Sequence, residues 1–197
     1  IKKIPNLIES RKKLLTIYIR TRGSSQKNQF SKNRNSDSIH YLETIKYFIK
    51  LKWNIIIIGD NYLNLALRFK DNDSLIYAEK FSVSKRLLEI YSMINSNFII
   101  STLGGANMLS FYNHTVYVNM FPIGHIPAHY KMNNLFNKRD DFILNKNVYF
   151  KGKKISNSKK FYDIYYKSQL PKEYLIKQNT SNEILNFCKN HYKKYIN

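Results

Sequence analysis

Cysteine is almost absent from this sequence of 197 residues, since Cys188 is the only one. A single cysteine excludes a disulfide-stapled scaffold, and no zinc site with the usual Cys/His spacing can be assembled around it. Long apolar runs are missing as well. The longest is Ile55–Ile58, far short of the roughly 18–20 residues that span a bilayer. The sequence therefore predicts a domain of a reducing compartment without a membrane-spanning helix.

Acidic residues are also scarce: 13 Asp and Glu stand against 33 Lys and Arg, a formal net charge of +20. Such a charge favours nucleic-acid binding, because clustered cations neutralise phosphates. Only seven of the basic residues are arginine, however, and the lysines are scattered among many Ile, Asn and Tyr residues. All four types have AT-rich codons, so we interpret most of the lysine excess as composition bias. We expect no specific nucleic-acid partner, while attraction to anionic lipid or to a sugar nucleotide stays open.

Glycine and proline are sparse, with six and four residues, and they form no linker that would divide the chain. Hydrophobic residues make up 43% and aromatic residues 15%, which is enough for a packed core and excludes wholesale disorder. A chain of this length normally forms one domain, so we expect a single domain over residues 1–197. Because the sequence starts at Ile1 and no signal-peptide pattern follows, we also expect this domain to be excised from a longer protein.

Strands and helices are predicted to alternate along the chain. Continuous β-branched and aliphatic runs are typical of strands buried on both faces, and they occur at Leu14–Ile19, Asn54–Asp60, Asn97–Thr102 and Thr115–Asn119. Apolar residues at helical spacing follow Ser38, Ser84 and Thr180. The alternation predicts an α/β fold with a Rossmann-like, doubly wound and mostly parallel sheet that carries helices on both faces.

The same spacing predicts which side of each helix is buried. The first helix, ending near Trp53, is expected to bury an apolar face from Ile39 to Ile49. The second is expected to turn Leu87, Leu88, Tyr91 and Ile94 inward. In the last helix Thr180 and Glu183 form a capping box, and Cys188 lies on the apolar face, as a core side chain rather than a nucleophile. A peripheral strand is expected at Asn147–Phe150.

Polar residues follow the predicted parallel strands, and ligands of open α/β sheets bind beyond these carboxyl ends. Arg20 and Arg22 follow the first strand, and a guanidinium group forms the paired hydrogen bonds that suit a phosphate. Gly59 and Asp60 end the second strand. Glycine permits close backbone approach, and the carboxylate can accept a hydrogen bond from a sugar or ribose hydroxyl. The structural alternative is a surface arginine after a strand and an Asp that caps the next segment.

The third strand runs into Ser101, Thr102, Gly104 and Gly105, and then into a helical segment. Small hydroxyl side chains, two glycines and a helix start are typical of an anion site, because backbone N–H groups converge there. The pattern is neither a P-loop nor a dinucleotide fingerprint, since the lysine and the third glycine are missing, and a tight packing turn is the structural alternative. Asn119, after the fourth strand, adds one more polar group at this edge.

Further candidates lie outside the strand ends. Arg34 and Tyr41 flank the start of the first helix and are candidates to close over a ligand. His125 and His129 have the chemistry of general bases, but we favour structural roles for them. No metal site is predicted, because the acidic run 71–73 is surrounded by residues that indicate a loop. No catalytic residue is assigned.

Taken in order, these motifs resemble a known family, the bacterial glycosyltransferases of the GT-B type that build surface polysaccharides. More distantly, their order is similar to that of fucosyltransferases whose strand-end arginine contacts the donor diphosphate. The resemblance spans roughly residues 14–190. The motifs that carry it are Tyr18-Ile19-Arg20, Arg34, Tyr41, Ile55–Asp60, Ile76-Tyr77-Ala78, Ser96–Gly105, Val118-Asn119-Met120-Phe121-Pro122, and Thr180–Ile184 before the last helix.

The resemblance implies a metal-independent transfer of sugar from a nucleotide-sugar donor to a glycan or lipid-linked acceptor. This chain would be the C-terminal, donor-binding half of a two-domain enzyme whose N-terminal acceptor domain is missing. The enzyme would be cytoplasmic, with peripheral contact to the inner face of an anionic membrane. The donor is a substrate, so no cofactor is expected.

Site residues follow from the same resemblance. Arg20, assisted by Arg34, would contact the donor diphosphate. Gly59 and Asp60 would lie near the nucleoside, and the Ser/Thr/Gly-Gly turn from Ser101 to Gly105 would bind phosphate or sugar. This chain has an additional Thr21-Arg22-Gly23 segment, which leaves open whether Arg20 or Arg22 serves the diphosphate. Two other functions remain open from the residues alone, a basic nucleic-acid-binding module and a different α/β enzyme that uses nucleotides or phosphates.

Overall fold

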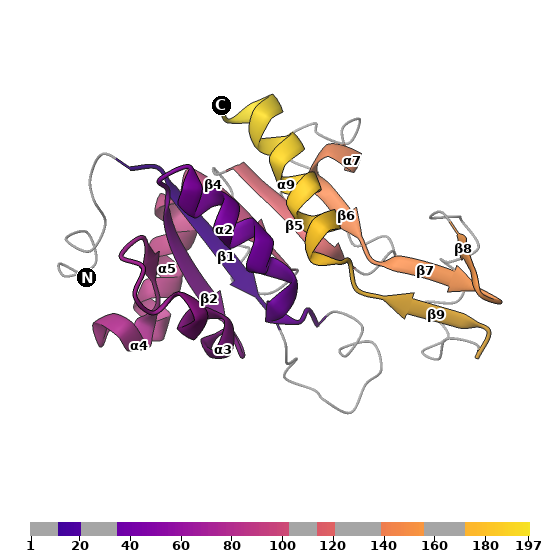
Figure 1. Cartoon of the computed structure of the whole chain (residues 1–197), viewed down its shortest axis with the longest axis horizontal. Coiled ribbons are helices and arrows are strands. Elements are labelled where there is room, and N and C mark those ends of the chain that lie inside the picture. The colour runs from indigo at the N-terminus through magenta and orange to yellow at the C-terminus, as the bar shows by residue number, and fades with distance from the viewer. Residues whose placement is uncertain (1–11, 21–34, 103–113, 121–138, 156–171) are drawn as a thin grey trace.

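The computed structural model describes residues 12–20, 35–102, 114–120, 139–155 and 172–197. Their centre is a six-stranded sheet in the order β3-β2-β1-β4-β5-β6, with every neighbouring pair parallel (Figure 1). The strands are β1 (Leu14–Ile19), β2 (Asn54–Gly59), β3 (Leu75–Ile76), β4 (Phe98–Ser101), β5 (His114–Met120) and β6 (Ile143–Asn145). The expectation of an α/β, Rossmann-like parallel sheet is confirmed.

The central strands are mostly apolar because both of their faces are covered. Alternate residues of β1 point to opposite sides, so Leu15 and Ile17 pack in a core cluster with Phe48. Leu14 instead joins a second cluster on the other face, with Leu88. The four strands expected from apolar runs are all present, with ends that differ by at most one residue.

The first face is covered by two helices that pack against each other, α2 (Leu42–Lys50) and α9 (Ser181–Tyr195). A 3-10 turn, η2 (Ser38–Tyr41), precedes α2, and its Ile39 is 41% exposed rather than buried. This side chain departs from the expected face because the turn has a period of three residues, not 3.6. The helix ends at Lys50, before Lys52 adopts a positive φ of 60°.

The last helix begins as its capping box predicts. Thr180 accepts a hydrogen bond from the Glu183 backbone N–H, and the Glu183 carboxylate accepts one from the Thr180 backbone N–H. Cys188 is fully buried in the core below α2, as expected. His191, which the apolar pattern did not mark, is also buried.

The second face is covered by α5 (Lys85–Asn95), which follows the short helix α4 (Ala78–Phe81). The inward residues of α5 are Leu88, Ser92 and Met93. Leu87 and Ile94, which were expected inward, are 39% and 54% exposed. The observed rotation packs Leu88 and Met93 in the second core cluster, and the Thr16 hydroxyl of β1 lies 2.6 Å from the Ser96 hydroxyl just beyond the helix.

A second, antiparallel sheet of three strands follows β6 (Figure 1). It consists of β7 (Asn147–Phe150), β8 (Lys153–Ile155) and β9 (Tyr174–Lys177), with β7 in the middle. The peripheral strand expected at Asn147–Phe150 is therefore confirmed. The remaining short elements are α3 (Leu63–Ala66), η3 (Leu67–Phe69) and α7 (Arg139–Phe142). No helix among these described segments is long and apolar enough to cross a membrane.

Candidate functional site

The carboxyl ends of β1, β2 and β4 are tied together by backbone hydrogen bonds. Asp60 N–H donates to the Ile19 carbonyl at 2.8 Å, and Thr102 N–H donates to the Tyr18 carbonyl at 3.1 Å. The Arg20 N–H donates in turn to the Thr102 hydroxyl at 2.8 Å. Three predicted site residues, Arg20, Asp60 and Thr102, therefore lie at one edge of the sheet.

Gly59 brings β2 unusually close to β1. Its φ is +104°, and a Cβ atom at this position would lie 2.1 Å from the Ile19 carbonyl oxygen. A real Cβ contact is at least about 1 Å longer, so only glycine fits here without moving the backbone. The glycine was expected to permit a close backbone approach, and the partner in the structure is the neighbouring strand.

Ser101 and Thr102 are both fully buried. The Ser101 hydroxyl donates to the Thr102 carbonyl at 2.8 Å. The Thr102 hydroxyl accepts from Arg20 N–H and reaches the Tyr18 carbonyl at 3.4 Å. These hydroxyl groups hold the strand ends in register. The two glycines that follow, Gly104 and Gly105, lie outside the described residues, as do Arg22, Arg34, His125 and His129.

Asn119 lies at the same edge but inside the protein, only 1% exposed. Its Nδ2 donates to the Ser36 hydroxyl at 2.6 Å, and its Oδ1 accepts from Asn179 N–H at 2.6 Å. The Ser36 hydroxyl also lies 3.0 Å from the phenol oxygen of Tyr41. Tyr41 is fully buried, and burial raises the pKa of its phenol. It belongs to the core and does not stand over the edge as a lid.

A buried lysine adjoins this network. Lys146 is 6% exposed, and its ammonium donates to the Asn35 carbonyl at 2.5 Å. Burial lowers the pKa of this lysine to about 8, against the opposing effect of the Asp37 carboxylate. Perturbed lysines are common at functional sites. Sequence reasoning missed Lys146, because one lysine among so many carries no distinguishing signal.

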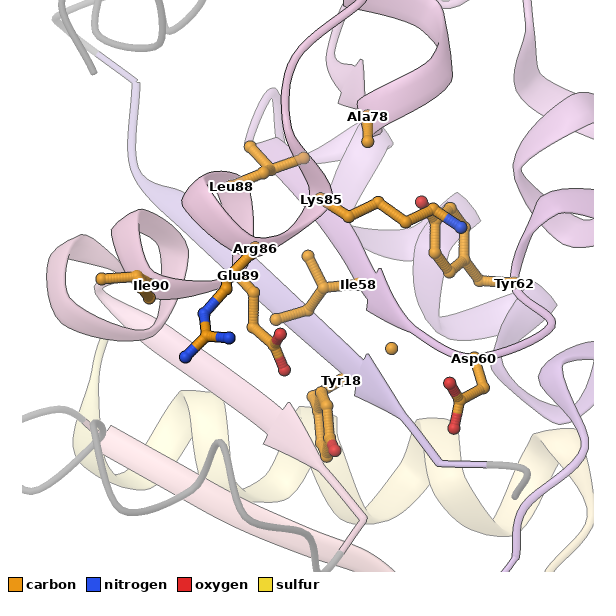
Figure 2. Close-up of a pocket in the computed structure, with 11 residues that line it drawn as sticks. Tyr18, Ile58, Asp60, Tyr62, Ala78, Lys85, Arg86, Leu88, Glu89 and Ile90 are labelled. Atoms are coloured by element: carbon orange, nitrogen blue, oxygen red, sulfur yellow. The ribbon is translucent and has the colours of Figure 1, made fainter. Parts of the chain in front are cut away.

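A cavity of about 610 Å³ opens where β1 and β2 end, on the face covered by α5. Its floor is formed by Tyr18, Ile58 and Gly59, and α5 contributes one wall (Figure 2). In Figure 2, the Glu89 carboxylate reaches from α5 toward Tyr18 with Arg86 beside it, and Asp60 lies on the opposite side of the cavity. The cavity lies at the edge where a ligand of an open α/β sheet binds, and its size is typical of small-molecule sites.

The charges in this cavity are mixed. Burial raises the pKa of Glu89, the nearby Asp60 carboxylate raises it further, and Arg86 has the opposite effect. Two carboxylates therefore share a partly enclosed space with an arginine. Both can accept hydrogen bonds from hydroxyl groups, and the guanidinium group can bind an anion.

A second group of side chains fixes the cavity's far wall. Tyr62 donates from its phenol to Glu79 Oε2 at 2.9 Å, and the Lys85 ammonium lies 3.1 Å from Glu79 Oε1. The same ammonium lies 5.2 Å from the centre of the Tyr62 ring. Burial, followed by the Glu79 contact, raises the pKa of the Tyr62 phenol. Lys85 therefore lines the cavity beside Tyr62, with its side chain 65% exposed.

Lys85, Arg86 and Glu89 were not among the predicted site residues. A signal for them existed in the sequence: two cations follow Ser84 directly, at the start of a helix. Cations are unusual in a first helical turn because they oppose the helix dipole. No group of three or more metal-ligating side chains occurs among the residues that the structure describes.

Comparisons with protein-family models, with curated proteins and with solved structures find no match to this chain.

Proposed function

We propose that this chain is the nucleotide-sugar-binding domain of a glycosyltransferase of the GT-B type. The observation that carries the proposal is the cavity at the carboxyl ends of β1 and β2, which combines two hydroxyl acceptors, Asp60 and Glu89, with the cation Arg86. A nucleotide sugar presents matching groups, because it has ribose and sugar hydroxyls next to a diphosphate. The parallel sheet in the order β3-β2-β1-β4-β5-β6 supports the same class, since this strand order is typical of nucleotide-binding domains.

The chemistry of sugar transfer assigns roles to these residues. Negative charge develops on the leaving nucleoside diphosphate, and an enzyme that works without a bound metal neutralises it with cations and backbone N–H groups. Arg20 and Arg86 would supply the neutralising positive charge, while the Asp60 carboxylate would accept a hydrogen bond from a hydroxyl of the nucleoside. Arg22, Arg34 and the Gly104-Gly105 turn remain part of this proposal.

On the same resemblance we also propose binding partners for the domain. The acceptor, a glycan or a lipid-linked sugar, would bind mainly to a separate N-terminal domain. The donor-binding domain alone would then bind nucleotide sugar without transferring it. No catalytic residue is proposed, since none of the described side chains has a geometry that identifies a base for the acceptor hydroxyl.

Thermal unfolding with added UDP, GDP and their sugar conjugates tests the donor. A ligand present at about 100 times its dissociation constant adds about 2.7 kcal/mol of stability, which corresponds to a rise in Tm of about 5–10 °C for a domain of this size. Arg86 lines the cavity, whereas Arg20 follows β1 at the same edge of the sheet without lining it. We expect both Arg86→Gln and Arg20→Ala to reduce the shift. The matched control is Arg68→Gln, because Arg68 is an exposed arginine on η3 that does not line the cavity.

Three outcomes would contradict the proposal. The first is the absence of any shift with these compounds. The second is stabilisation by dinucleotides or by inorganic phosphate alone, which would favour a different α/β nucleotide or phosphate enzyme. The third is an equal loss of the shift in the Arg86 and Arg68 variants, which would place the ligand outside the cavity.

A further inference from the structure

The cavity at the ends of β1 and β2 holds more negative than positive charge. The Asp60 and Glu89 carboxylates face it from opposite sides, and Arg86 lies beside Glu89 (Figure 2). Lys85 also lines the cavity, but its ammonium group lies 3.1 Å from the Glu79 carboxylate, which offsets its charge. Among the described lining residues, one cation, Arg86, is therefore set against two carboxylates, although the whole chain carries a formal net charge of +20.

The position of Glu89 favours the protonated form of its carboxyl group. The side chain is half-buried on α5, and this burial raises its pKa because water solvates the charged form less well. The Asp60 carboxylate raises the pKa further, while Arg86 lowers it. Within the described parts of the chain, neither carboxylate lies at ion-pair distance from a cation. Glu89 can therefore bind a proton at a pH where an ordinary glutamate is ionised.

The titratable and charged side chains around Glu89 come from α5 and from the segments packed against it. They are Lys85 and Arg86 on α5, Tyr18 on β1, Asp60 after β2, Tyr62 before α3 and Glu79 on α4. Ordinary phenol, ammonium and guanidinium groups do not titrate between about pH 5 and pH 8. A proton taken up by this cavity in that range is therefore expected on a carboxylate.

A diphosphate would bring further negative charge into the cavity. A bound anion disfavours the ionised form of a neighbouring carboxyl group. Protonation of Glu89 removes one of the two repelling carboxylates and leaves Arg86 set against Asp60 alone. The neutral carboxyl group can also donate a hydrogen bond to a phosphate oxygen, and its carbonyl oxygen can still accept one from a sugar hydroxyl. The ligand and the proton therefore favour each other's binding.

We propose that the cavity takes up one proton from solution when it binds a nucleotide sugar, and that the Glu89 carboxylate binds this proton. The inference rests on the proposed function, because it requires a diphosphate in the cavity. The complex then holds more protons than the free protein, so a rise in pH favours dissociation. Binding is strongest at mildly acidic pH, and its pH dependence ends where Glu89 of the free protein is already protonated.

Isothermal titration calorimetry with UDP-glucose and GDP-mannose measures this coupling. In both compounds the diphosphate is a diester, which lacks the ionisation at about pH 6 of a terminal phosphate, so the protein must bind any proton taken up. Heats of binding in buffers of different ionisation enthalpy should report about one proton per ligand at about pH 7. The Kd should be at least about tenfold higher at about pH 7.5 than at about pH 5.5, because one coupled proton changes affinity by up to about tenfold per pH unit.

The decisive variant is Glu89→Gln, because an amide resembles the protonated carboxyl group in shape and charge. At about pH 7.5 this variant should bind as tightly as the wild-type chain does at about pH 5.5, without proton uptake. Removal of a carboxylate that lines the cavity should therefore strengthen binding. The matched control is Glu43→Gln, because Glu43 is also a helical glutamate three residues from a cation, Lys46, but belongs to α2 and does not line the cavity. It should keep the wild-type pH dependence.

Carbon NMR of the Glu89 side-chain carboxyl group tests the carboxylate pair without any ligand. Asp60→Asn should move the titration midpoint of Glu89 to lower pH, because the Asp60 charge raises the pKa of Glu89. Asp73→Asn removes a carboxylate that does not line the cavity and should leave the midpoint in place.

Four results would overturn the inference. They are equal affinity of the wild-type chain at the two pH values, a retained pH dependence in Glu89→Gln, weaker binding of Glu89→Gln than of the wild-type chain at the higher pH, and an unmoved Glu89 midpoint in Asp60→Asn. Absence of binding by both nucleotide sugars at both pH values would instead reject the proposed function, and the coupling with it. Circular dichroism of each variant at both pH values distinguishes lost binding from lost folding.

Discussion

Replacing Gly59 with alanine should separate two costs that the structure combines at this residue. The first is conformational, because φ is +104° and an L-residue pays about 1–2 kcal/mol in left-handed conformations. The second is steric, because the new Cβ would lie 2.1 Å from the Ile19 carbonyl oxygen, which is backbone and cannot rotate away. That carbonyl also accepts the Asp60 N–H bond, so moving it costs about 1 kcal/mol more. We expect a total loss of about 3–4 kcal/mol.

Gly152 is the matched control. Its φ is also positive, +78°, but no atom lies within 4 Å of the position its Cβ would take. Gly152→Ala therefore has only the conformational cost, partly offset by the lower entropy of the unfolded chain, and should lose about 1 kcal/mol. Asparagine tolerates positive φ better than alanine does. Gly152→Asn should therefore recover most of the loss, whereas Gly59→Asn should not.

Urea unfolding followed by circular dichroism measures these differences. In thermal unfolding the loss at Gly59 corresponds to a fall in Tm of about 10 °C, and the loss at Gly152 to about 2–4 °C. Equal losses at the two glycines, or recovery by asparagine at both, would refute the argument that the close approach of β2 to β1 demands glycine.

Three further predictions concern α9. Burial lowers the pKa of His191 to about 4; the Asp141 carbonyl and carboxylate oppose this shift, and His114 and Lys194 add to it. Because the histidine of the unfolded chain takes up a proton at higher pH, acidification from about pH 6.5 to pH 4 should lower the free energy of unfolding by about 3 kcal/mol. His191→Phe should flatten this pH dependence in urea unfolding, because phenylalanine does not titrate. The ring at this position stacks on Phe98, so an aromatic replacement keeps that contact. Burial raises the pKa of the Cys188 thiol, so an aromatic disulfide reagent should label this thiol only as fast as the protein unfolds. Rapid labelling of the native protein would contradict the core position of Cys188. Thr180→Ala removes the capping-box acceptor and should lower the free energy of unfolding by about 1 kcal/mol, whereas an unchanged value would show that the cap contributes nothing.

Much of the fold could be predicted because its strands are buried on both faces. Four of the six residues in β1 and in β2 are aliphatic, and such runs can be recognised without knowledge of the neighbouring strands. The two-residue β3 and three-residue β6 were not predicted, because segments of that length have no measurable period. They are strands only because an existing strand offers hydrogen bonds beside them. The same holds for β9, which pairs with a strand far away in the sequence.

Some residues of the candidate site could likewise be predicted from the sequence, and others could not. The strand ends predicted Arg20, Asp60 and Thr102, since parallel strands bring their carboxyl ends to one edge. Arg86 and Glu89 were missed because they belong to the cavity only through the position of α5 over β1 and β2.

The sequence by itself determined the α/β alternation, the edge of the sheet to which Arg20, Asp60 and Thr102 come, and the start of α9, because these depend on local periodicity, strand direction and capping. Only the tertiary structure decided which face of α5 turns inward, and therefore that Leu87 and Ile94 remain exposed. The apolar pattern of α5 is compatible with more than one rotation, and the observed one depends on packing against residues distant in the sequence, since Leu88 and Met93 join a core cluster with Ile56 of β2.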